Sequence, residues 1–126
     1  MTVLVVTGTR RGRPDVEDRL DAWVAQHGYP SRIVIGDAAG VDFQARRWAI
    51  ERGVTWSVHV ADWKGRGRLA GPERNQRMVD AAGPGAHLLA LPDWQSVGTY
   101  DCIARARKAK LHVQVCPVRE DAEARS

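Results

Sequence analysis

Short apolar runs and helical repeats alternate along the chain, and together they predict five strands separated by four helices. The runs are mostly apolar and rich in Val, Ile and Leu, as expected of strands that are buried on both faces of a sheet. The predicted strands cover residues 3–7, 32–35, 55–60, 87–91 and 111–115.

Between the strands, apolar side chains recur three and four positions apart, which predicts amphipathic helices. Val16, Leu20, Trp23 and Val24 form such a stripe, and Gly28 ends it. A polar, glycine-bearing loop is expected over residues 61–71. The predicted helices cover residues 15–27, 41–52, 72–82 and about 99–109.

Strands that alternate with helices of about ten residues predict the α/β class. We expect a single Rossmann-like, three-layer domain over residues 1–116, with a mostly parallel sheet of about five strands. Residues 117–126 are charged and poor in apolar side chains, which predicts a flexible tail. In parallel sheets ligands bind beyond the carboxyl ends of the strands. Every unusual loop of this chain follows a strand, so we expect one site at that edge.

The composition is ordinary for a globular protein. The chain has 126 residues, of which 44% are hydrophobic and 27% charged, which suits one domain. No apolar run approaches the roughly 20 residues of a membrane helix, and the first residues lack signal-peptide features. We therefore expect a cytoplasmic protein without a membrane partner. The four histidines and two cysteines show no zinc-binding spacing, so we expect no metal and no cofactor.

The net charge of +4 is carried mainly by arginine, and it favours anionic partners. A guanidinium group suits phosphate because it offers two donors at once. A solvated basic surface explains the same surplus, so the positions of the arginines matter more than their number.

The loops after the first two strands contain candidate ligand-binding residues. Gly8, Thr9 and Arg10 combine close backbone approach, a hydroxyl and a guanidinium near a helix N-terminus, an arrangement that attracts anions. A plain turn would use the same residues, and no G-x-G-x-x-G fingerprint follows the strand, which disfavours an ordinary NAD-binding domain. In the second loop a ligand could approach the backbone at Gly40. Asp42 either caps the next helix or accepts hydrogen bonds from a ribose hydroxyl.

The third loop and the helix after it add an aromatic ring and several cations. Trp63 lies among three basic residues, as a stacking platform for a base with charge for its phosphate would, although a solvated loop has the same composition. Arg74 and Arg77 lie on the following helix. An arginine on the sheet side of that helix would be costly unless it were paired with an anion.

The loop after the fourth strand leads into a helix through Gly98 and Thr99, which offer backbone N–H groups and a hydroxyl to a phosphate. Asp101 follows in the first turn of that helix. It either complements the helix dipole or acts as a general base.

With these residues the chain resembles the SLOG superfamily of Rossmann-like domains, which includes the Lonely Guy phosphoribohydrolases and DprA. It is most similar to the YspA-like branch. The Gly-Ala-x-Gly-x-Asp signature is matched by residues 37–42, and the strings at 61–63 and 70–78 are typical of that branch.

In Lonely Guy enzymes an Arg-Lys-x-x-Met element supplies a catalytic arginine, and Arg74 with Met78 is similar to it. A Pro-Gly-Gly-x-Gly-Thr-x-Glu element supplies phosphate-binding glycines and a catalytic glutamate. Gly98, Thr99 and Asp101 are similar to its end, but the paired glycines are missing, the loop is longer and Asp101 replaces glutamate. The resemblance therefore implies Arg74 and Asp101 as catalytic residues and supports binding better than catalysis.

The leading hypothesis is a SLOG domain that senses or processes a nucleotide or another phosphorylated small molecule, and the resemblance implies a homodimer. One alternative is hydrolysis of the N-glycosidic bond of a nucleoside 5′-monophosphate. Another is DprA-like binding of single-stranded nucleic acid through basic residues on the outer helix faces. Those residues are Arg46, Arg47, Arg105, Arg107, Lys108 and Lys110.

Overall fold

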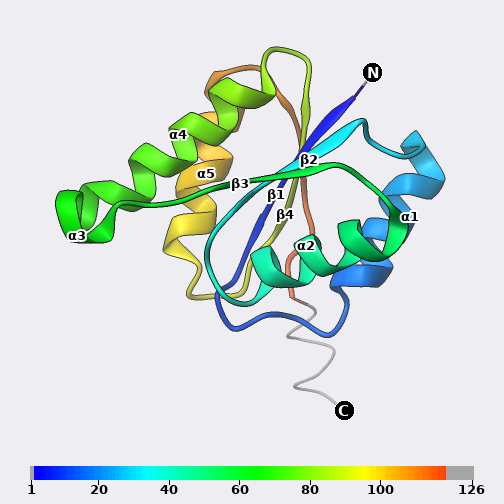
Figure 1. The fold of residues 1–126 in the computed structure, drawn as a ribbon, viewed down its shortest axis with the longest axis horizontal. Coiled ribbons are helices and arrows are strands. Elements are labelled where there is room, and N and C mark those ends of the chain that lie inside the picture. The colour runs from blue at the N-terminus through cyan, green and yellow to red at the C-terminus, as the bar shows by residue number, and fades with distance from the viewer. Residues whose placement is uncertain (1, 119–126) are drawn as a thin grey trace.

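A computed structural model describes residues 2–118, and at its centre lies a sheet of five parallel strands (Figure 1). The strand order is β3-β2-β1-β4-β5, and each neighbouring pair is parallel. The predicted α/β class with a parallel sheet is therefore confirmed. The expected tail at 117–126 lies, from residue 119 onward, outside the described residues. The strands are β1 (Val3–Gly8), β2 (Arg32–Gly36), β3 (Trp56–His59), β4 (His87–Leu91) and β5 (His112–Val115).

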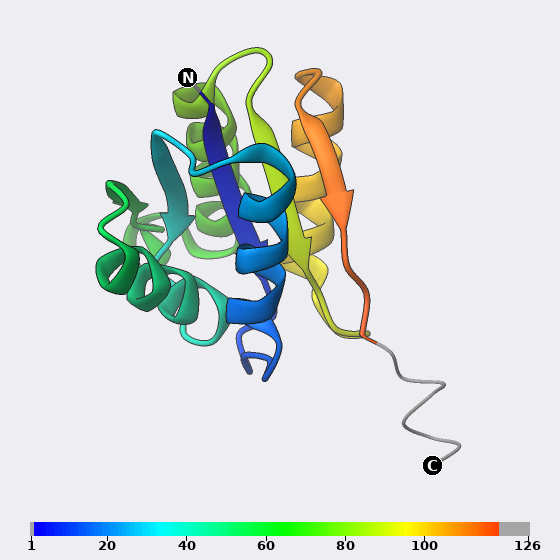
Figure 2. The same cartoon turned by 90° about the vertical axis from the view of Figure 1, so that its right-hand side faces the viewer.

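Helices cover both faces of the sheet and complete three layers. Helices α1 (Val16–His27) and α2 (Val41–Arg52) lie on one face, and α4 (Ala70–Ala82) and α5 (Val97–Lys108) lie on the other. Figure 2 shows α1 in front of the sheet, with α4 and α5 behind it. None of the helices within residues 2–118 is both long and apolar enough to cross a membrane.

Alternate residues of β1, β2 and β4 enter different cores. In β1, Leu4 and Val6 pack on the side of α1 and α2, whereas Val5 packs on the other side with Met78 and Ile103. Successive side chains of a strand point to opposite faces, so a strand covered on both sides needs apolar residues at every position. This explains why the interiors of β1, β2 and β4 are continuous apolar runs, whereas the edge strands β3 and β5 also contain polar residues.

The prediction of an irregular loop over 61–71 was wrong, because short helices fill most of it. Helix α3 (Trp63–Arg66) is followed by the 3₁₀ helix η1 (Gly67–Leu69), and α4 begins at Ala70. The Asp62 carboxylate accepts a hydrogen bond from the Gly65 N–H at 2.9 Å and so caps α3. Pro72 lies within the first turn of α4, where no backbone donor is needed.

Helix α5 also begins earlier than predicted, at Val97, so Thr99 is inside the helix and does not cap it. The N-cap position belongs to Ser96, whose hydroxyl donates to the Asp93 carboxylate at 2.9 Å. The Asp93 N–H in turn donates to that hydroxyl at 2.9 Å. The loop before α5 is therefore folded on itself by side-chain hydrogen bonds.

The strand order reverses between β1 and β4. The chain passes from β1 through α1 to β2 on one side, and from β3 through α4 back to β4 on the other. Gly8 at the end of β1 is paired with Leu91 at the end of β4. The loops after these strands lead to opposite faces of the sheet, which leaves the kind of crevice that holds ligands in open α/β sheets.

Candidate functional site

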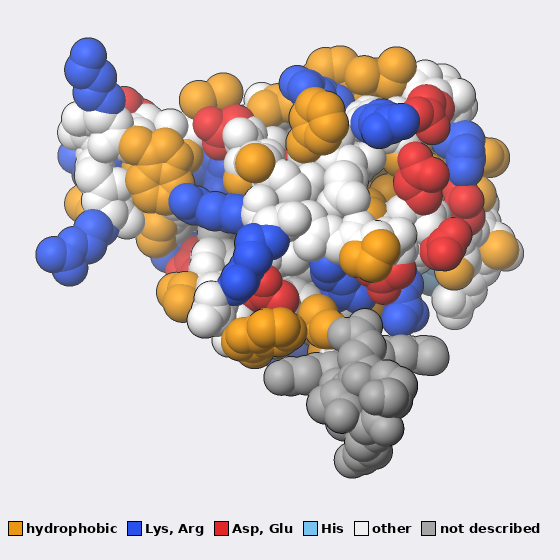
Figure 3. Space-filling view, turned by 90° about the horizontal axis from the view of Figure 1, so that it is seen from below, with side chains coloured by type: hydrophobic (Ala, Val, Ile, Leu, Met, Phe, Trp, Pro, Cys, Tyr) orange, Lys and Arg blue, Asp and Glu red, His pale blue; other side chains and the backbone are white. Residues whose placement is uncertain are grey.

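A cavity of about 530 Å³ opens at this switch point, beyond the carboxyl ends of β1 and β4. Its size falls in the range of roughly 300–1,000 Å³ that is usual for small-molecule pockets. Figure 3 views the loops that follow β1 and β4, and Lys and Arg side chains gather across the middle of this face beside Asp and Glu. The sequence-predicted residues that line the cavity are Gly8, Thr9, Arg10, Asp42, Trp63, Arg74, Gly98, Thr99 and Asp101.

Two residues predicted for the site, Gly40 and Arg77, do not line this cavity. Gly40 has a φ of +78°, and a Cβ atom there would collide with the carbonyl oxygen of Thr9. Its role in the structure is close packing, because it brings the start of α2 against the loop after β1. Arg77 donates from Nη2 to the carbonyl oxygen of Val60 at 2.7 Å, beyond the end of β3.

A hydrogen bond across the switch point joins the loops that follow β1 and β4. The Thr9 hydroxyl donates to Asp93 Oδ2 at 2.7 Å, and the Gln95 N–H donates to Asp93 Oδ1 at 2.8 Å. Burial opposes ionisation of Asp93, but hydrogen bonds from Thr9, Gln95 and Ser96 outweigh it and lower its pKa to about 2. Sequence reasoning missed this carboxylate, although an Asp three residues before a Ser is a recognisable turn signal.

Arg13, which the sequence analysis also missed, is a second residue that connects the loops after β1 and β4. Its side chain is buried, and Nη1 donates to the carbonyl oxygens of Pro92, at 2.9 Å, and Cys116. The other donors, Nε and Nη2, bind the two carboxylate oxygens of Asp15 at 2.9 and 2.7 Å. A buried guanidinium is tolerated because each of these bonds compensates for lost hydration. Two of its partners, Pro92 and Cys116, lie far along the chain, so no local pattern identifies these contacts.

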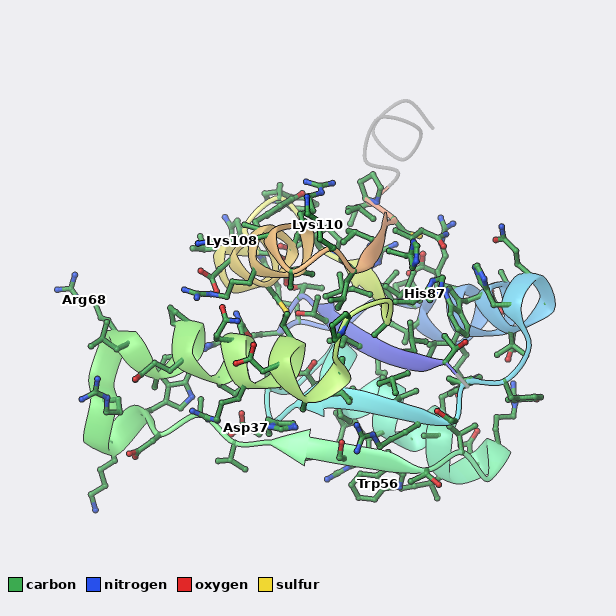
Figure 4. All side chains as sticks on the ribbon, turned by 90° about the horizontal axis from the view of Figure 1, so that it is seen from above. Asp37, Trp56, Arg68, His87, Lys108 and Lys110 are labelled. Carbon is green, nitrogen blue, oxygen red and sulfur yellow. The ribbon has the colours of Figure 1, made fainter. Side chains whose placement is uncertain are left out.

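Arg74 lines the cavity and lies close to two carboxylates, Asp37 and Asp42. The residue is 8% exposed, and its Nη1 donates to Asp37 Oδ1 at 2.7 Å. In Figure 4 Asp37 lies between α4 and the end of β3. The guanidinium occupies the space over Gly36 that a Cβ atom would fill, and Asp42 borders the same space. The charge of Arg74 is therefore compensated by Asp37, as the sequence argument about a buried arginine requires.

Asp42 is buried in the first turn of α2, and its Oδ2 accepts a hydrogen bond from the Ala38 N–H at 3.1 Å. Gly40 holds the N-cap position, so Asp42 fastens the preceding loop instead. Burial raises the pKa of Asp42 from 3.8 to about 6, although the charge of Arg74 acts in the opposite direction. The site thus contains a carboxyl group that changes ionisation near neutral pH.

Asn75 links the two candidate catalytic residues, and sequence reasoning did not single it out. Its Nδ2 donates to Asp101 Oδ2 at 3.0 Å, while its Oδ1 accepts from Arg74 Nε at 3.1 Å. Asp101 also accepts from Arg105 Nε at 2.9 Å. Arg74 and Asp101 come from different helices and are brought together through this one amide.

The mouth of the cavity attracts anions. Gly98 in the first turn of α5 has open space around its Cα, so a ligand can approach the positive end of that helix. The Arg10 guanidinium lies over the Trp63 ring, 5.0 Å from its centre, and Trp63 is 43% exposed. Arg68 also lines the cavity, and Figure 4 shows it extending from the tip formed by α3 and η1. Among residues 2–118, no cluster of three or more His, Cys, Asp or Glu has the geometry to hold a metal ion.

Comparison with known proteins assigns the chain to a protein family. A family model described as "YspA, cpYpsA-related SLOG family" matches residues 2–65. The chain is also 39% identical over 121 residues to the Gene 61 protein of Mycobacterium phage D29, an alignment that covers 90% of this chain and 94% of that protein. No solved structure matches the chain. The family match includes the loops after β1 and β2, whereas Arg74 and Asp101 lie beyond it.

The raised pKa of Asp42 predicts a pH-dependent stability difference for Asp42→Asn. The folded protein binds the proton more tightly than the unfolded chain, so ionisation of Asp42 lowers the stability of the wild type as pH rises from about 4 through 6. A neutral amide avoids this loss. We expect Asp42→Asn to be more stable than the wild type by roughly 2–3 kcal/mol at pH 8 and about equal at pH 4, measured by urea unfolding.

Asp18→Asn on the exposed side of α1 is the matched control, and its effect is expected to be small at both pH values. A loss of stability for Asp42→Asn that is the same at pH 4 and pH 8 would contradict a raised pKa for Asp42.

Proposed function

Because the chain belongs to the YspA, cpYpsA-related SLOG family, we propose that it binds a nucleotide or nucleotide derivative in the cavity at the switch point. Membership of this family supports a nucleotide-related role. The observation that carries the proposal is the composition of the cavity wall: a helix N-terminus and arginines at the mouth, carboxylates within, and an exposed indole at the side. These are the groups that phosphate, ribose and base respectively require.

The phosphate fits best at the first turn of α5. Gly98 leaves space for close approach, and the Thr99 hydroxyl and the Arg10 guanidinium line the same cavity. The N–H groups of a first helical turn and a nearby guanidinium both stabilise an anion. Carboxylates repel phosphate, so Asp42 and Asp101 suit the sugar hydroxyls. Trp63 offers a partly exposed face on which a base can stack.

The first test of this proposal is stabilisation by nucleotides. A nucleoside mono- or diphosphate at about 100 times its Kd is expected to raise the free energy of unfolding by roughly 2.7 kcal/mol, and adenosine without phosphate much less. Gly98→Val combined with Thr99→Ala should remove the phosphate-dependent part, because it fills the approach to α5 and deletes the hydroxyl. Thermal unfolding with and without ligand measures both effects.

Tyr100→Ala is the matched control for this variant. Tyr100 is exposed on the same helix turn and does not line the cavity. If the shift survives in the Gly98 and Thr99 double variant as it does in Tyr100→Ala, the phosphate binds elsewhere.

Hydrolysis of a nucleoside 5′-monophosphate is the second candidate function, and the joint placement of Arg74 and Asp101 in the cavity favours it. Water would add to C1′ while the N-glycosidic bond breaks, which releases the free base and ribose 5-phosphate. Asp101 would stabilise the positive charge on the sugar or accept the proton of the water, and Arg74 would position the phosphate or assist departure of the base. No residue of this proposal requires a metal.

The carboxylate variants test this chemistry. Asp101→Asn should abolish base release and retain ligand binding, because it keeps the shape and removes the charge. Asp101→Glu should raise the rate if reach limits the reaction, since displacements near 1 Å can change rates about 10²-fold. Base release measured by chromatography decides the outcome. If neither the wild type nor Asp101→Glu releases base from any common monophosphate, the protein binds its ligand without hydrolysing it.

We also propose that the protein forms a homodimer. Large apolar residues are exposed on α2 and β3, namely Phe43, Ile50 and Trp56. Figure 4 shows Trp56 on β3, the strand at one edge of the sheet. Burying such residues against a second copy would remove apolar surface from water. Sedimentation should show a dimer at micromolar concentration, and a strict monomer at several hundred micromolar would contradict this.

A further inference from the structure

Asn75 occupies an unusual position for an amide side chain, between two helices and two charged groups. It is 2% exposed, and its side chain takes part in hydrogen bonds with three residues. Oδ1 accepts from Arg74 Nε, and Nδ2 donates both to Asp101 Oδ2 and to the carbonyl oxygen of Gly98, at 3.1 Å. Both ends of the amide are therefore used, one toward a cation and one toward an anion.

The neighbouring residues bind only some of the polar atoms of Asp101 and Arg74. Asp101 Oδ2 receives both Asn75 and Arg105, and no described residue donates to Asp101 Oδ1. Arg74 uses Nε for Asn75 and Nη1 for Asp37, and its Nη2 makes no hydrogen bond to residues 2–118. Asp101 Oδ1 and Arg74 Nη2 are accessible, because neither belongs to the fully buried polar atoms that lack a partner. Both residues line the cavity. One carboxylate oxygen and one guanidinium nitrogen thus remain for a ligand.

We propose that Asn75 is a positioning residue that directs Asp101 Oδ1 and Arg74 Nη2 toward the same sugar hydroxyl region of the ligand. A hydroxyl group both donates and accepts, so it can bind a carboxylate oxygen and a guanidinium nitrogen together. The bond to the Gly98 carbonyl fixes the first turn of α5 relative to this pair. The assignment rests on the proposed nucleotide site and adds that the ligand carries free ribose hydroxyls.

A role limited to packing between α4 and α5 would also bury Asn75. The variant Asn75→Asp distinguishes such a packing role from the proposed positioning role. The introduced carboxylate loses the donor to Asp101 and repels it. Two carboxylates at this distance share one proton, which raises the pKa of one of them, so at acidic pH an O–H group again links the two residues. Positioning is therefore restored by protonation, whereas lost packing is not.

The readout is the preference for a ribonucleoside diphosphate over its 2′,3′-dideoxy form, measured by calorimetry with ADP and dideoxy-ADP at pH 8 and pH 5.5. Hydrogen bonds to charged groups predict a preference of about tenfold in the wild type. We expect Asn75→Asp to lose most of it at pH 8 and to regain it at pH 5.5. The charged groups around the amide, Asp37, Asp42, Arg74, Asp101 and Arg105, are present in both proteins, so the wild type at each pH is the reference.

Gln26→Glu is the control, because it adds the same charge on the exposed side of α1 without lining the cavity. It should keep the wild-type preference at both pH values. If Asn75→Asp does not fold, Asn75→Ser replaces it and is expected to lower the preference while keeping the affinity for dideoxy-ADP.

Each outcome bears on a different claim. Absence of binding of either diphosphate to the wild type would refute the proposed function itself. Binding without a ribose preference, or a preference that Asn75→Asp leaves unchanged or lowers equally at both pH values, would refute the role of Asn75 and leave the nucleotide site standing.

Discussion

The contacts across the gap between β1 and β4 hold the candidate site in shape. Where the strand order reverses, the two loops leave the sheet toward opposite faces, so no helix covers the gap. The Thr9 hydroxyl closes it by donating to Asp93, and the Thr9 N–H donates to the Leu91 carbonyl oxygen at 3.1 Å. Arg13 adds a buried connection to the Pro92 carbonyl oxygen. The floor of the cavity is fixed by these bonds, while its mouth stays open to a ligand.

Charged groups inside the site are paired with one another, and this pairing limits what each can do. Arg74 is compensated by Asp37, and Asp101 by Arg105 and Asn75. Burial raises the pKa of Asp42, which has no ion pair within 4.0 Å among the described residues. An unpaired buried carboxyl costs stability, and such costs are common at functional sites because binding needs groups that folding does not use.

The strands and most helices could be predicted from the sequence because their signal is local. A strand such as β1 is apolar at every interior position since both of its faces are covered. Helix α3 could not be predicted in this way. Gly65 within it and Gly67 directly after it argue against a helix, yet the Asp62 cap and the ion pair between Arg66 and Glu73, at 2.8 Å, stabilise the turn.

Among the site residues, too, those with a local sequence signal could be predicted and those without one could not. Loops after strands could be recognised by position, and Arg10, Asp42 and Asp101 line one cavity although they come from three separate segments. The contacts from Arg13 to Pro92 and from Thr9 to Asp93 could not be recognised, because they join residues 79 and 84 positions apart in the chain. Such long-range partners follow from the strand order, which no local pattern specifies.

The hydrogen bonds to Asp101 limit the role that it could have in the proposed hydrolysis. The Asp101 Oδ2 atom accepts from the Arg105 guanidinium, four residues on in the same helix, and also from Asn75. This carboxylate can stabilise a cationic sugar, since that requires only negative charge. Proton transfer from water demands more, because the water must lie within hydrogen-bond distance of Oδ1, the one Asp101 oxygen to which no described residue donates. If the site does cleave a glycosidic bond, the pairing therefore favours electrostatic stabilisation by Asp101 over proton transfer to it.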